Sequence, residues 1–376
     1  MFFMKIALVH DYLTQLGGAE KVLENFQWVF KKSPIFVLIY DKKKTGHIFS
    51  HSKIHTSWLQ NLPFSTVKYQ WYLMAMPIAQ EAYKLDEFDV ILSSASSFAK
   101  GVRIGDSILH ICYCHTPTRY LWHDTQNYVR ELGYNEFVKK IIPFFLKRLR
   151  NWDFMAAQKV DRFIANSCVV KARIKKYYKR DAQVIYPPVE TDKFYIARKL
   201  GDYYLTGGRL VSYKRYDLAV RTFNKLGIKL KVFGVGPESK KLRKMAGKNI
   251  EFLGEVSDKK KAELYSQCLA FIHPQTEDFG ITAVEAMAAG RPVIAYDDGG
   301  ARETIIPGRT GEFFNEQSWE SLSDIVVNFD ENKYSPKLIK EHAEKFSQAR
   351  FRKEIFAYVQ KEWQEFEMNR VFKIKC

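Results

Sequence analysis

Short apolar stretches alternate with longer amphipathic ones along the whole chain. The short stretches are rich in β-branched residues and predict buried strands, whereas apolar residues spaced three or four apart between them predict helices. In the first half, strands are expected at 6–9, 35–39, 90–93, 108–113, 162–165 and 184–186. In the second half, they are expected at 203–206, 230–233, 250–253, 270–273 and 292–295. This alternation is typical of parallel βαβ units and predicts an α/β protein with two doubly wound sheets.

Two consecutive prolines divide this pattern. Pro187 and Pro188 follow the last strand expected in the first half, and such a pair stops a strand and stiffens an extended link. We therefore expect a first domain over 1–186 and a second over 187–350. Apolar residues recur at helical spacing from Phe351 onward, which predicts a closing helix over about 351–376 that packs back on the first domain.

Composition places the chain among folded globular proteins. It has 376 residues, of which 46% are hydrophobic and 27% charged, so we expect at least two cores and neither disorder nor a single small module. The five cysteines form no CxxC pair, which argues against a disulfide framework or a zinc site and favours the cytosol. The N-terminus reads as a first strand rather than a signal peptide. No apolar run approaches the roughly 20 residues that span a bilayer, so any membrane contact would be peripheral.

The charge is strongly positive and unevenly distributed. There are 59 Lys and Arg against 42 Asp and Glu, a formal net charge of +17, which favours an anionic partner. The segment 139–180 holds 13 basic residues and two acidic ones, interleaved with aromatic residues. It predicts a basic amphipathic helix for an anionic membrane surface or an acceptor diphosphate, although a solvated face beside a buried stripe explains the pattern almost as well. The candidate contacts are Lys139, Lys140, Lys147, Arg148, Arg150 and Trp152.

The segment 273–295 carries the most informative chemistry. A strand ends near His273, a polar loop follows, and Gly280 opens a helix whose unpaired N–H groups form an anion site. Glu277 lies in the loop, at the carboxyl end of a strand, where open α/β sheets bind ligands. Glu285 lies about one and a half turns into the helix, where its carboxylate could reach a ligand hydroxyl. The plainer interpretation is a solvated loop acid and a charge on a helix surface.

The order of several motifs resembles the family 4 retaining glycosyltransferases. Seven residues separate Glu277 from Glu285 within EDFGITAVEAMAAGRPVIA. Further segments in the same order are GGAEKVLE (17–24), CHTPTRYLW (114–122), VIYPPVETDKF (184–194), GGRLVSYKR (207–215) and VFGVGPESKKLR (232–243). The resemblance covers nearly the whole chain. Within the family it is strongest to bacterial transferases that move mannose or a related sugar onto lipid-linked surface glycans.

The resemblance implies a GT-B fold, in which two Rossmann-like domains face each other across a cleft. The first domain would bind the acceptor and the second the nucleotide-sugar donor. In the catalytic set, His115 would orient the donor sugar, Glu277 would hold its hydroxyls, and Arg209 and Lys214 would neutralise the departing diphosphate. The implied donor-binding residues are Gly17, Gly18, Gly234, Gly236, Val256, Asp278, Phe279, Gly280, Ile281, Thr282 and Glu285.

The expected mechanism follows from the same resemblance. No DxD metal-phosphate motif occurs in the sequence, so protein groups would stabilise the leaving group, and we expect neither a metal nor another cofactor. Transfer would take place on the front face of the sugar, with the departing phosphate accepting the acceptor's proton. The expected donor is GDP-mannose, the expected acceptor is a lipid-linked glycan at the cytosolic membrane face, and no nucleic acid is expected.

Three other functions remain open on the sequence. A nucleotide-sugar epimerase or sugar-phosphate synthase would use the same architecture, and donor turnover without a glycan acceptor would distinguish it. A nucleic-acid or other polyanion binder would fit the net charge and would show a steep dependence of affinity on salt. A lectin-like protein would bind sugar without reacting, although donor-diphosphate residues argue against it.

Overall fold

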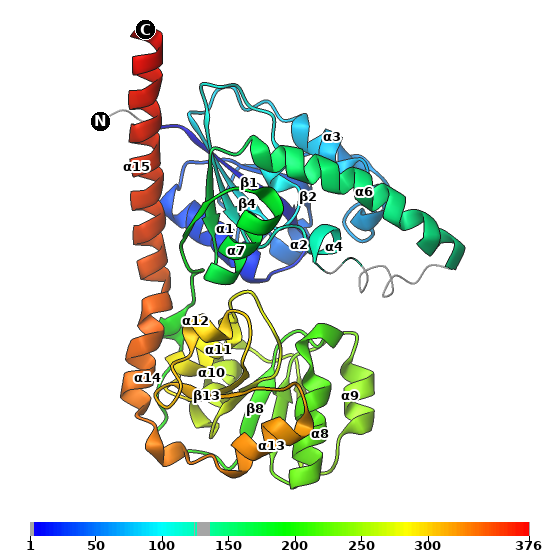
Figure 1. Ribbon diagram of the computed structural model, residues 1–376, viewed down its shortest axis with the longest axis vertical. Coiled ribbons are helices and arrows are strands. Elements are labelled where there is room, and N and C mark those ends of the chain that lie inside the picture. Colours follow the sequence, from blue (N-terminus) through cyan, green and yellow to red (C-terminus); the bar gives the residue numbers. More distant parts are fainter. Residues whose placement is uncertain (1–3, 124, 126–135, 376) are drawn as a thin grey trace. The chain divides into compact units, whose positions relative to one another are not determined.

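The computed structural model describes residues 4–123, 125 and 136–375 of the chain. The chain forms two compact units, one comprising Met1–Pro187 with Phe351–Cys376 and the other Pro188–Arg350. Figure 1 labels their helices and strands. Each unit is built on its own parallel sheet, so the expected α/β class with two doubly wound sheets is confirmed.

The first unit has a seven-stranded parallel sheet in the order β3-β2-β1-β4-β5-β6-β7. Its strands alternate in side-chain direction, so that Leu8 and Leu92 face one hydrophobic cluster while Val9 and Ile91 face another. The strands are β1 (Ile6–Leu13), β2 (Ile35–Tyr40), β3 (Ile54–Thr56), β4 (Val90–Ala95), β5 (Leu109–Cys114), β6 (Arg162–Ala165) and β7 (Ala182–Val184).

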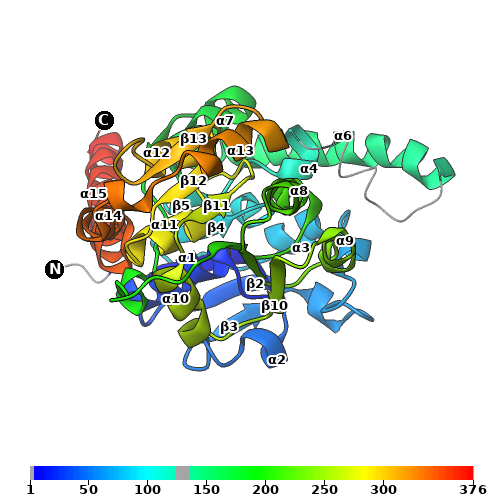
Figure 2. The same cartoon turned by 90° about the horizontal axis from the view of Figure 1, so that it is seen from below.

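Helices cover both faces of this sheet. Phe26 of α1 (Gly18–Val29) packs on one face, and Ile174 of α7 (Cys168–Tyr178) and Ala157 of α6 (Glu136–Gln158) pack on the other. The shorter helices are α2 (Lys42–Thr45), α3 (Met76–Glu81) and α4 (Arg119–Trp122). In Figure 2 helices lie on both sides of the strands of this unit.

The closing helix α15 (Gln348–Lys375) belongs to the core of the first unit from Phe351 onward. Phe351, Ile355 and Val359 are fully buried in the cluster that contains Phe26. The rings of Phe351 and Phe26 stack with centroids 5.9 Å apart. Burial of each such side chain contributes on the order of 1.5–3 kcal/mol, which accounts for the return of the chain's end to this unit.

The second unit has a six-stranded parallel sheet in the order β10-β9-β8-β11-β12-β13. Phe223 and Leu322 pack on one face, and Tyr265 contacts Phe233 and Phe271 on the other. The strands are β8 (Tyr204–Gly207), β9 (Leu230–Phe233), β10 (Ile250–Gly254), β11 (Phe271–His273), β12 (Val293–Tyr296) and β13 (Gly311–Phe314). The helices are α8 (Tyr216–Leu226), α9 (Ser239–Met245), α10 (Asp258–Gln267), α11 (Ile281–Ala288), α12 (Ala301–Thr304), α13 (Trp319–Val327) and α14 (Pro336–Ala343).

Both sheets reverse their strand order beside their first strand. The reversal lies between β1 and β4 in one sheet and between β8 and β11 in the other. At such a switch point the loops leaving neighbouring strands diverge, and open α/β sheets bind ligands in the crevice that results. We therefore expect ligand-binding side chains at the carboxyl ends of these four strands and of β5.

The observed strands differ from the expected ones mainly at the edges of the two sheets. Strand β3 and strand β13 were not expected, because IHT and GEFF are too short and too mixed in polarity to give a strand pattern. The strand expected at 184–186 lies at Ala182–Val184. Among the described residues, no helix combines the length and apolar character needed to cross a membrane.

Candidate active site

In the first unit, the loop after β4 is fixed by one buried carboxylate. Asp11 is 3% exposed, and its two oxygens accept four backbone N–H bonds of 2.7–2.9 Å from residues 96–99. A buried charge that is hydrogen-bonded in this way is retained without an ionic partner. Asp11 therefore ties β1 to the loop that leaves β4 at the switch point.

His115 follows β5 directly, at the same edge of the sheet. Its Nε2 lies 2.8 Å from the Ser94 hydroxyl, and that hydroxyl lies 3.1 Å from Nδ1 of His10. His10 Nε2 is in turn 3.9 Å from a carboxylate oxygen of Glu20 on α1. Only His115 was predicted as a site residue. The signal for His10 and Ser94 was present, since both are polar residues near the carboxyl ends of strands that begin with apolar residues.

The glycine pair begins α1. Gly17 is the N-cap residue and Gly18 the first residue of the helix. Gly17 has φ −149°, an extended conformation open to any residue, but a Cβ atom there would lie 3.1 Å from a Glu20 carboxylate oxygen. The absence of a side chain at Gly17 thus leaves room for Glu20 beside His10.

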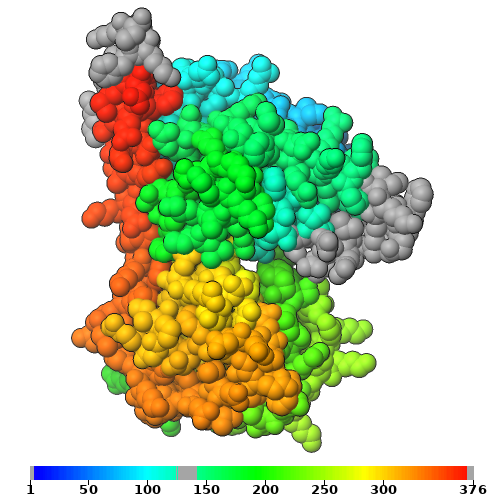
Figure 3. All heavy atoms as spheres, viewed as in Figure 1, coloured from blue at the N-terminus to red at the C-terminus, as the bar shows by residue number. Residues whose placement is uncertain are grey.

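The basic segment divides into an exposed part and a packed part on α6. Lys147 and Arg148 are exposed next to Phe144 and Phe145, which are 72% and 44% exposed. Figure 3 shows α6 at the surface of this unit. The side chains of Lys139 and Lys140 lie outside the described residues.

Arg150 and Trp152, also on α6, face inward. Trp152 donates from Nε1 to Glu81 at 2.7 Å, and its ring occupies the space that a Cβ atom on Gly101 would need. Arg150 donates to the Leu121 carbonyl and, at 3.3 Å, to the Thr125 hydroxyl. These two side chains hold α6 against its neighbours, a packing role that the sequence did not predict.

In the second unit, two predicted catalytic residues form an ion pair. Lys214 Nζ lies 2.8 Å from Glu277 Oε1, and the side chains are only 12% and 16% exposed. A Cβ atom on Gly208 would lie 3.6 Å from Lys214 Nζ and 3.9 Å from the methyl group of Thr282. The loop after β8, the loop after β11 and the start of α11 therefore converge at one place.

The start of α11 combines a turn that favours glycine with two buried polar atoms that are unpaired within the described part of the chain. Gly280 adopts φ +89°, a conformation that favours glycine. A Cβ atom there would lie 3.3 Å from Nε2 of His273. Among the residues that the structure describes, neither this Nε2 nor the Thr282 hydroxyl has a hydrogen-bond partner. Burial lowers the pKa of His273 to about 4, so its ring is neutral at pH 7.

The loop that carries Glu277 is held by hydrogen bonds to the segment after β12. The Thr276 hydroxyl donates to Asp298 at 2.9 Å, and the Gly300 N–H donates to the Glu277 carbonyl at 2.8 Å. Phe279 is 3% exposed and packs edge-on against Phe346 at 5.5 Å. Its side chain is thus part of the core, and only its backbone can contact a ligand.

Three further predicted residues lie around this point. Asp278 is half-buried in the same loop, Ile281 is the first residue of α11 and is also half-buried, and Arg209 is exposed on the loop after β8. The structure thus brings Lys214, Glu277 and the start of α11 together, with Arg209 exposed on the same loop as Lys214.

Glu285 is held by two residues that the sequence analysis did not identify. Lys261 Nζ lies 2.9 Å from one of its carboxylate oxygens, and the Tyr265 hydroxyl donates to the other at 3.2 Å. Burial alone would lower the pKa of Lys261, but the neighbouring Glu285 carboxylate outweighs it and the pKa is raised. Burial and then Glu285 raise the pKa of Tyr265, which stays a neutral donor. Lys261 is one of three consecutive lysines, so its sequence gave no sign of this role.

The loop after β9 packs closely against the backbone of the loop after β8, and glycines make this close contact possible. Gly234 adopts φ +102°, and a Cβ atom there would lie 1.9 Å from the Gly208 carbonyl oxygen. A Cβ atom on Gly236 would lie 2.3 Å from the Leu210 carbonyl oxygen. Both positions require glycine because backbone occupies the space of a side chain. Val256 is half-buried in the loop after β10.

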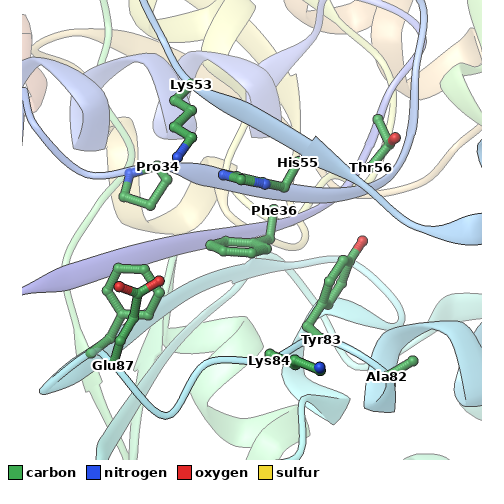
Figure 4. Close-up of a pocket in the computed structure, with 10 residues that line it drawn as sticks. Pro34, Phe36, Lys53, His55, Thr56, Ala82, Tyr83, Lys84 and Glu87 are labelled. Atoms are coloured by element: carbon green, nitrogen blue, oxygen red, sulfur yellow. The ribbon is translucent and has the colours of Figure 1, made fainter.

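A separate hollow lies at the opposite, amino-terminal end of the strands of the first unit. Its volume is about 390 Å³, and its lining includes Phe36, His55, Tyr83 and Lys84 (Figure 4). The rings of His55 and Phe36 stack at 4.8 Å. None of the predicted site residues lines this hollow. Within the described part of the chain, no group of three or more His, Cys, Asp or Glu side chains is arranged to hold a metal ion.

Comparison with known proteins assigns both units. Residues 16–193 match the model described as Glycosyltransferase Family 4, and residues 191–349 match that described as Glycosyl transferases group 1. An uncharacterized glycosyltransferase of Methanocaldococcus jannaschii is 24% identical over 92% of this chain and 94% of its own length. The alpha-1,3/1,6-mannosyltransferase of Mus musculus is 29% identical over 73% of this chain and 74% of its own.

A solved structure confirms the fold. The crystal structure of Anabaena HepE in complex with UDP has a TM-score of 0.71 to this chain at 16% identity, covering 95% of this chain and all of the other. Its sheets and those described above share the GT-B architecture. Because the two family models together match residues 16–349, the chain belongs to the family 4, group 1 glycosyltransferases and is a hexosyltransferase with the GT-B fold.

Proposed function

We propose that this enzyme transfers mannose from GDP-mannose to a lipid-linked glycan at the cytosolic face of the membrane, with retention of configuration. The observation that carries the proposal is the Lys214–Glu277 pair at the start of α11, a cation and a carboxylate placed together at an anion-binding helix end. A nucleotide-sugar offers each of them a partner, a diphosphate for the cation and a sugar hydroxyl for the carboxylate. The relatives that are named mannosyltransferases support mannose as the sugar.

The donor-binding roles follow from the positions of the side chains in the second unit. Glu285 would accept hydrogen bonds from the ribose, while Lys261 and Tyr265 hold its carboxylate in place. Gly234 and Gly236 leave backbone exposed to the nucleotide, with Val256 beside the base. The amides of 278–282 would bind the diphosphate, where the buried Thr282 hydroxyl supplies a further donor.

The proposed reaction needs charge stabilisation more than a nucleophile. The bond from the anomeric carbon to the phosphate oxygen breaks, and the acceptor oxygen bonds to the same face of that carbon. The acceptor's proton passes to the departing phosphate oxygen. Lys214, Arg209 and the amides at the start of α11 stabilise the negative charge that grows on the diphosphate, which is how such groups lower a barrier most effectively. Supplied with these groups, the reaction is proposed to need no metal.

In the first unit, His115 would contact the donor sugar, and α6 would contact the membrane. Lys147 and Arg148 stand beside Phe144 and Phe145 on an exposed face, a combination suited to an anionic lipid surface. Binding of this face to the membrane would bring the first unit close to an acceptor that is carried on a lipid diphosphate. The charge of the chain, +17, agrees with that partner.

The first experiment is a donor panel. GDP-, UDP-, dTDP- and ADP-sugars are tested by thermal shift with a chelator present, followed by slow hydrolysis of each donor that binds. A selective shift with GDP-mannose that is lost in Glu285→Gln supports the proposal. Glu263→Gln, which removes a carboxylate paired with Lys260 at 3.0 Å on the surface of α10, is the matched control. A shift with another donor only would overturn the choice of GDP-mannose, and no shift at all would overturn the donor site.

The membrane partner is tested by vesicle sedimentation. Binding to vesicles with 30% anionic lipid is expected to fall at least about 30-fold in the double variant Lys147→Glu/Arg148→Glu, since each of the two basic residues lost contributes about 1 kcal/mol near such a surface. Lys42→Glu/Lys43→Glu on α2 changes the charge equally at exposed positions elsewhere in the same unit. Equal losses in both double variants would show that net charge, not α6, drives the binding.

A further inference from the structure

A row of polar side chains crosses the sheet of the first unit just before its strands end. His10 on β1 pairs in register with Ser94 on β4, and Ser94 pairs with Tyr113 on β5. His115 lies two residues beyond Tyr113. Side chains two residues apart in a strand share a face, so these groups lie on the face covered by α1, as do Leu8 and Leu92. His10 is 2% exposed and Ser94 is fully buried.

The hydrogen atoms in this row can be assigned from its geometry. His10 Nδ1 lies 3.1 Å from the Ser94 carbonyl oxygen, which can only accept, so Nδ1 carries a hydrogen. The same nitrogen is 3.1 Å from the Ser94 hydroxyl oxygen, which therefore accepts from it. The hydroxyl's own hydrogen can then point at His115 Nε2, 2.8 Å away. In that arrangement Nε2 of His115 accepts, and a neutral ring carries its hydrogen on Nδ1.

We propose that Ser94, oriented by His10, is a positioning residue that fixes the ring and the tautomer of His115. The inference rests on the proposed function, in which His115 meets the donor sugar. With Nε2 accepting from the serine, Nδ1 of a neutral His115 ring is a hydrogen-bond donor and not an acceptor. The second nitrogen of a histidine commonly sets its tautomer in this way.

The row is anchored in α1 at its other end. Glu20 is 7% exposed and lies 3.9 Å from His10 Nε2, and the missing side chain at Gly17 leaves room for its carboxylate. The GGAE segment thus contributes to the site through Glu20 as well as through its backbone. A side chain at Gly17 would displace Glu20 and disturb His10 before it reached a ligand.

The neighbouring residue supplies a matched control. Ser93 points to the opposite face of β4, where its hydroxyl lies 2.8 Å from His110 Nε2. His110 is 1% exposed, and burial lowers its pKa to about 3. The two serines therefore make equally short contacts with imidazole rings, but only Ser94 contacts a histidine at the proposed site.

Nitrogen-15 NMR of histidine-labelled full-length protein tests the proposal. The His115 signals, assigned by their loss in His115→Gln, should show a protonated Nδ1 and an unprotonated Nε2. Ser94→Ala should replace this single form by a mixture of tautomers and lower kcat about 10–100-fold, the usual cost of losing a group that orients a site residue. Ser93→Ala should leave both the His115 signals and kcat as in the wild type.

Two substitutions at His10 separate positioning from packing. His10→Asn keeps an N–H donor where Nδ1 lies and should preserve the His115 tautomer and most of kcat, whereas His10→Leu should behave like Ser94→Ala. Thermal unfolding confirms that each variant is folded. A proton on Nε2 in the wild type, or unchanged signals in Ser94→Ala, would overturn the proposal. Because the spectra need no donor, they decide it even if every donor fails and the proposed function is wrong.

Discussion

The two units build their candidate sites from different chemistry. In the first unit, His10 and Ser94 are buried and form a chain of hydrogen bonds with the half-buried His115. In the second, Lys214–Glu277 and Lys261–Glu285 are ion pairs with side chains 12–26% exposed. A hydrogen-bond chain of this kind fixes one ring orientation before any ligand arrives. Ion pairs near the surface can instead exchange partners, since a diphosphate can replace the carboxylate beside a lysine without leaving a buried charge unpaired.

The largest effect is expected from removing one charge of the first ion pair. Glu277→Gln should lower kcat about 10²–10³-fold, because a carboxylate that holds the donor sugar and pairs with Lys214 is lost. Steady-state kinetics with the donor found in the panel measure this. Full turnover with unchanged donor affinity in Glu277→Gln would show that the Lys214–Glu277 pair is structural and that the second unit does not use it to bind the donor.

A smaller effect is expected at the second ion pair. Glu285→Gln should weaken binding of the nucleotide about 10–100-fold, in line with the 1.5–3 kcal/mol of a hydrogen bond to a charged group. Lys261→Met removes the partner and should weaken binding less, since Tyr265 still holds the carboxylate. Isothermal titration with the nucleotide alone compares the two. Equal losses would mean that the ion pair, rather than the carboxylate, is what the nucleotide needs.

Acid should destabilise both units through their buried neutral histidines. The pKa of His110 in the first unit is lowered to about 3 and that of His273 in the second to about 4, each by burial. The unfolded chain binds protons on them near pH 6.5, so above that pH both rings are neutral in the folded and the unfolded state and cost no stability. Below it the unfolded chain takes up protons that the folded units do not, so stability falls progressively down to about pH 4 for His273 and about pH 3 for His110.

Urea unfolding at pH 7, 6 and 5 checks this. Each histidine should add at most about 1.4 kcal/mol per pH unit to the slope of unfolding free energy below pH 6. His110→Gln and His273→Gln should each reduce that slope. An unchanged slope in His273→Gln would show that this ring takes up its proton in the folded unit as readily as in the unfolded chain.

The smallest effect is expected from salt. Raising NaCl from ~0.1 to ~0.5 M should weaken nucleotide binding several-fold, because the lysines of the second unit are partly exposed and their attraction to a diphosphate is screened. The His115 NMR signals should not change over the same range, since no charged group is needed in that chain. A salt-dependent tautomer of His115 would show that Glu20 and His10 act as an ion pair.

The sequence predicted the ligand-binding residues of the second unit better than it predicted the residues that hold them in place. Glu277, Glu285, Lys214 and the helix start at Gly280 could be found because they lie in one ordered set of motifs. The residues that hold them could not. Lys261 and Tyr265 reach Glu285 from another helix, and Lys261 stands in a run of lysines that is typical of a solvated surface.

Side-chain direction, which the sequence does not show, also separates the residues of α6 that the sequence analysis grouped as one membrane or acceptor contact. The sequence grouped Arg150 and Trp152 with Lys147 and Arg148 because they share one basic, aromatic stretch. On the helix, residues that are neighbours in sequence point in different directions, and Trp152 turns toward Glu81 and Gly101 while Lys147 and Arg148 face outward. Composition gave the charge of the helix but not the direction of each side chain.

The sequence by itself determined the two-sheet architecture, the family and the loops that carry the chemistry. Hydrophobic periodicity and glycine or proline positions are local properties, and they act within a few residues along the chain. Only the tertiary structure decided that Lys214 pairs with Glu277 and that Ser94 stands between His10 and His115. Such contacts join residues 21 to 84 positions apart, and they depend on strand order and register, which arise when the whole sheet packs.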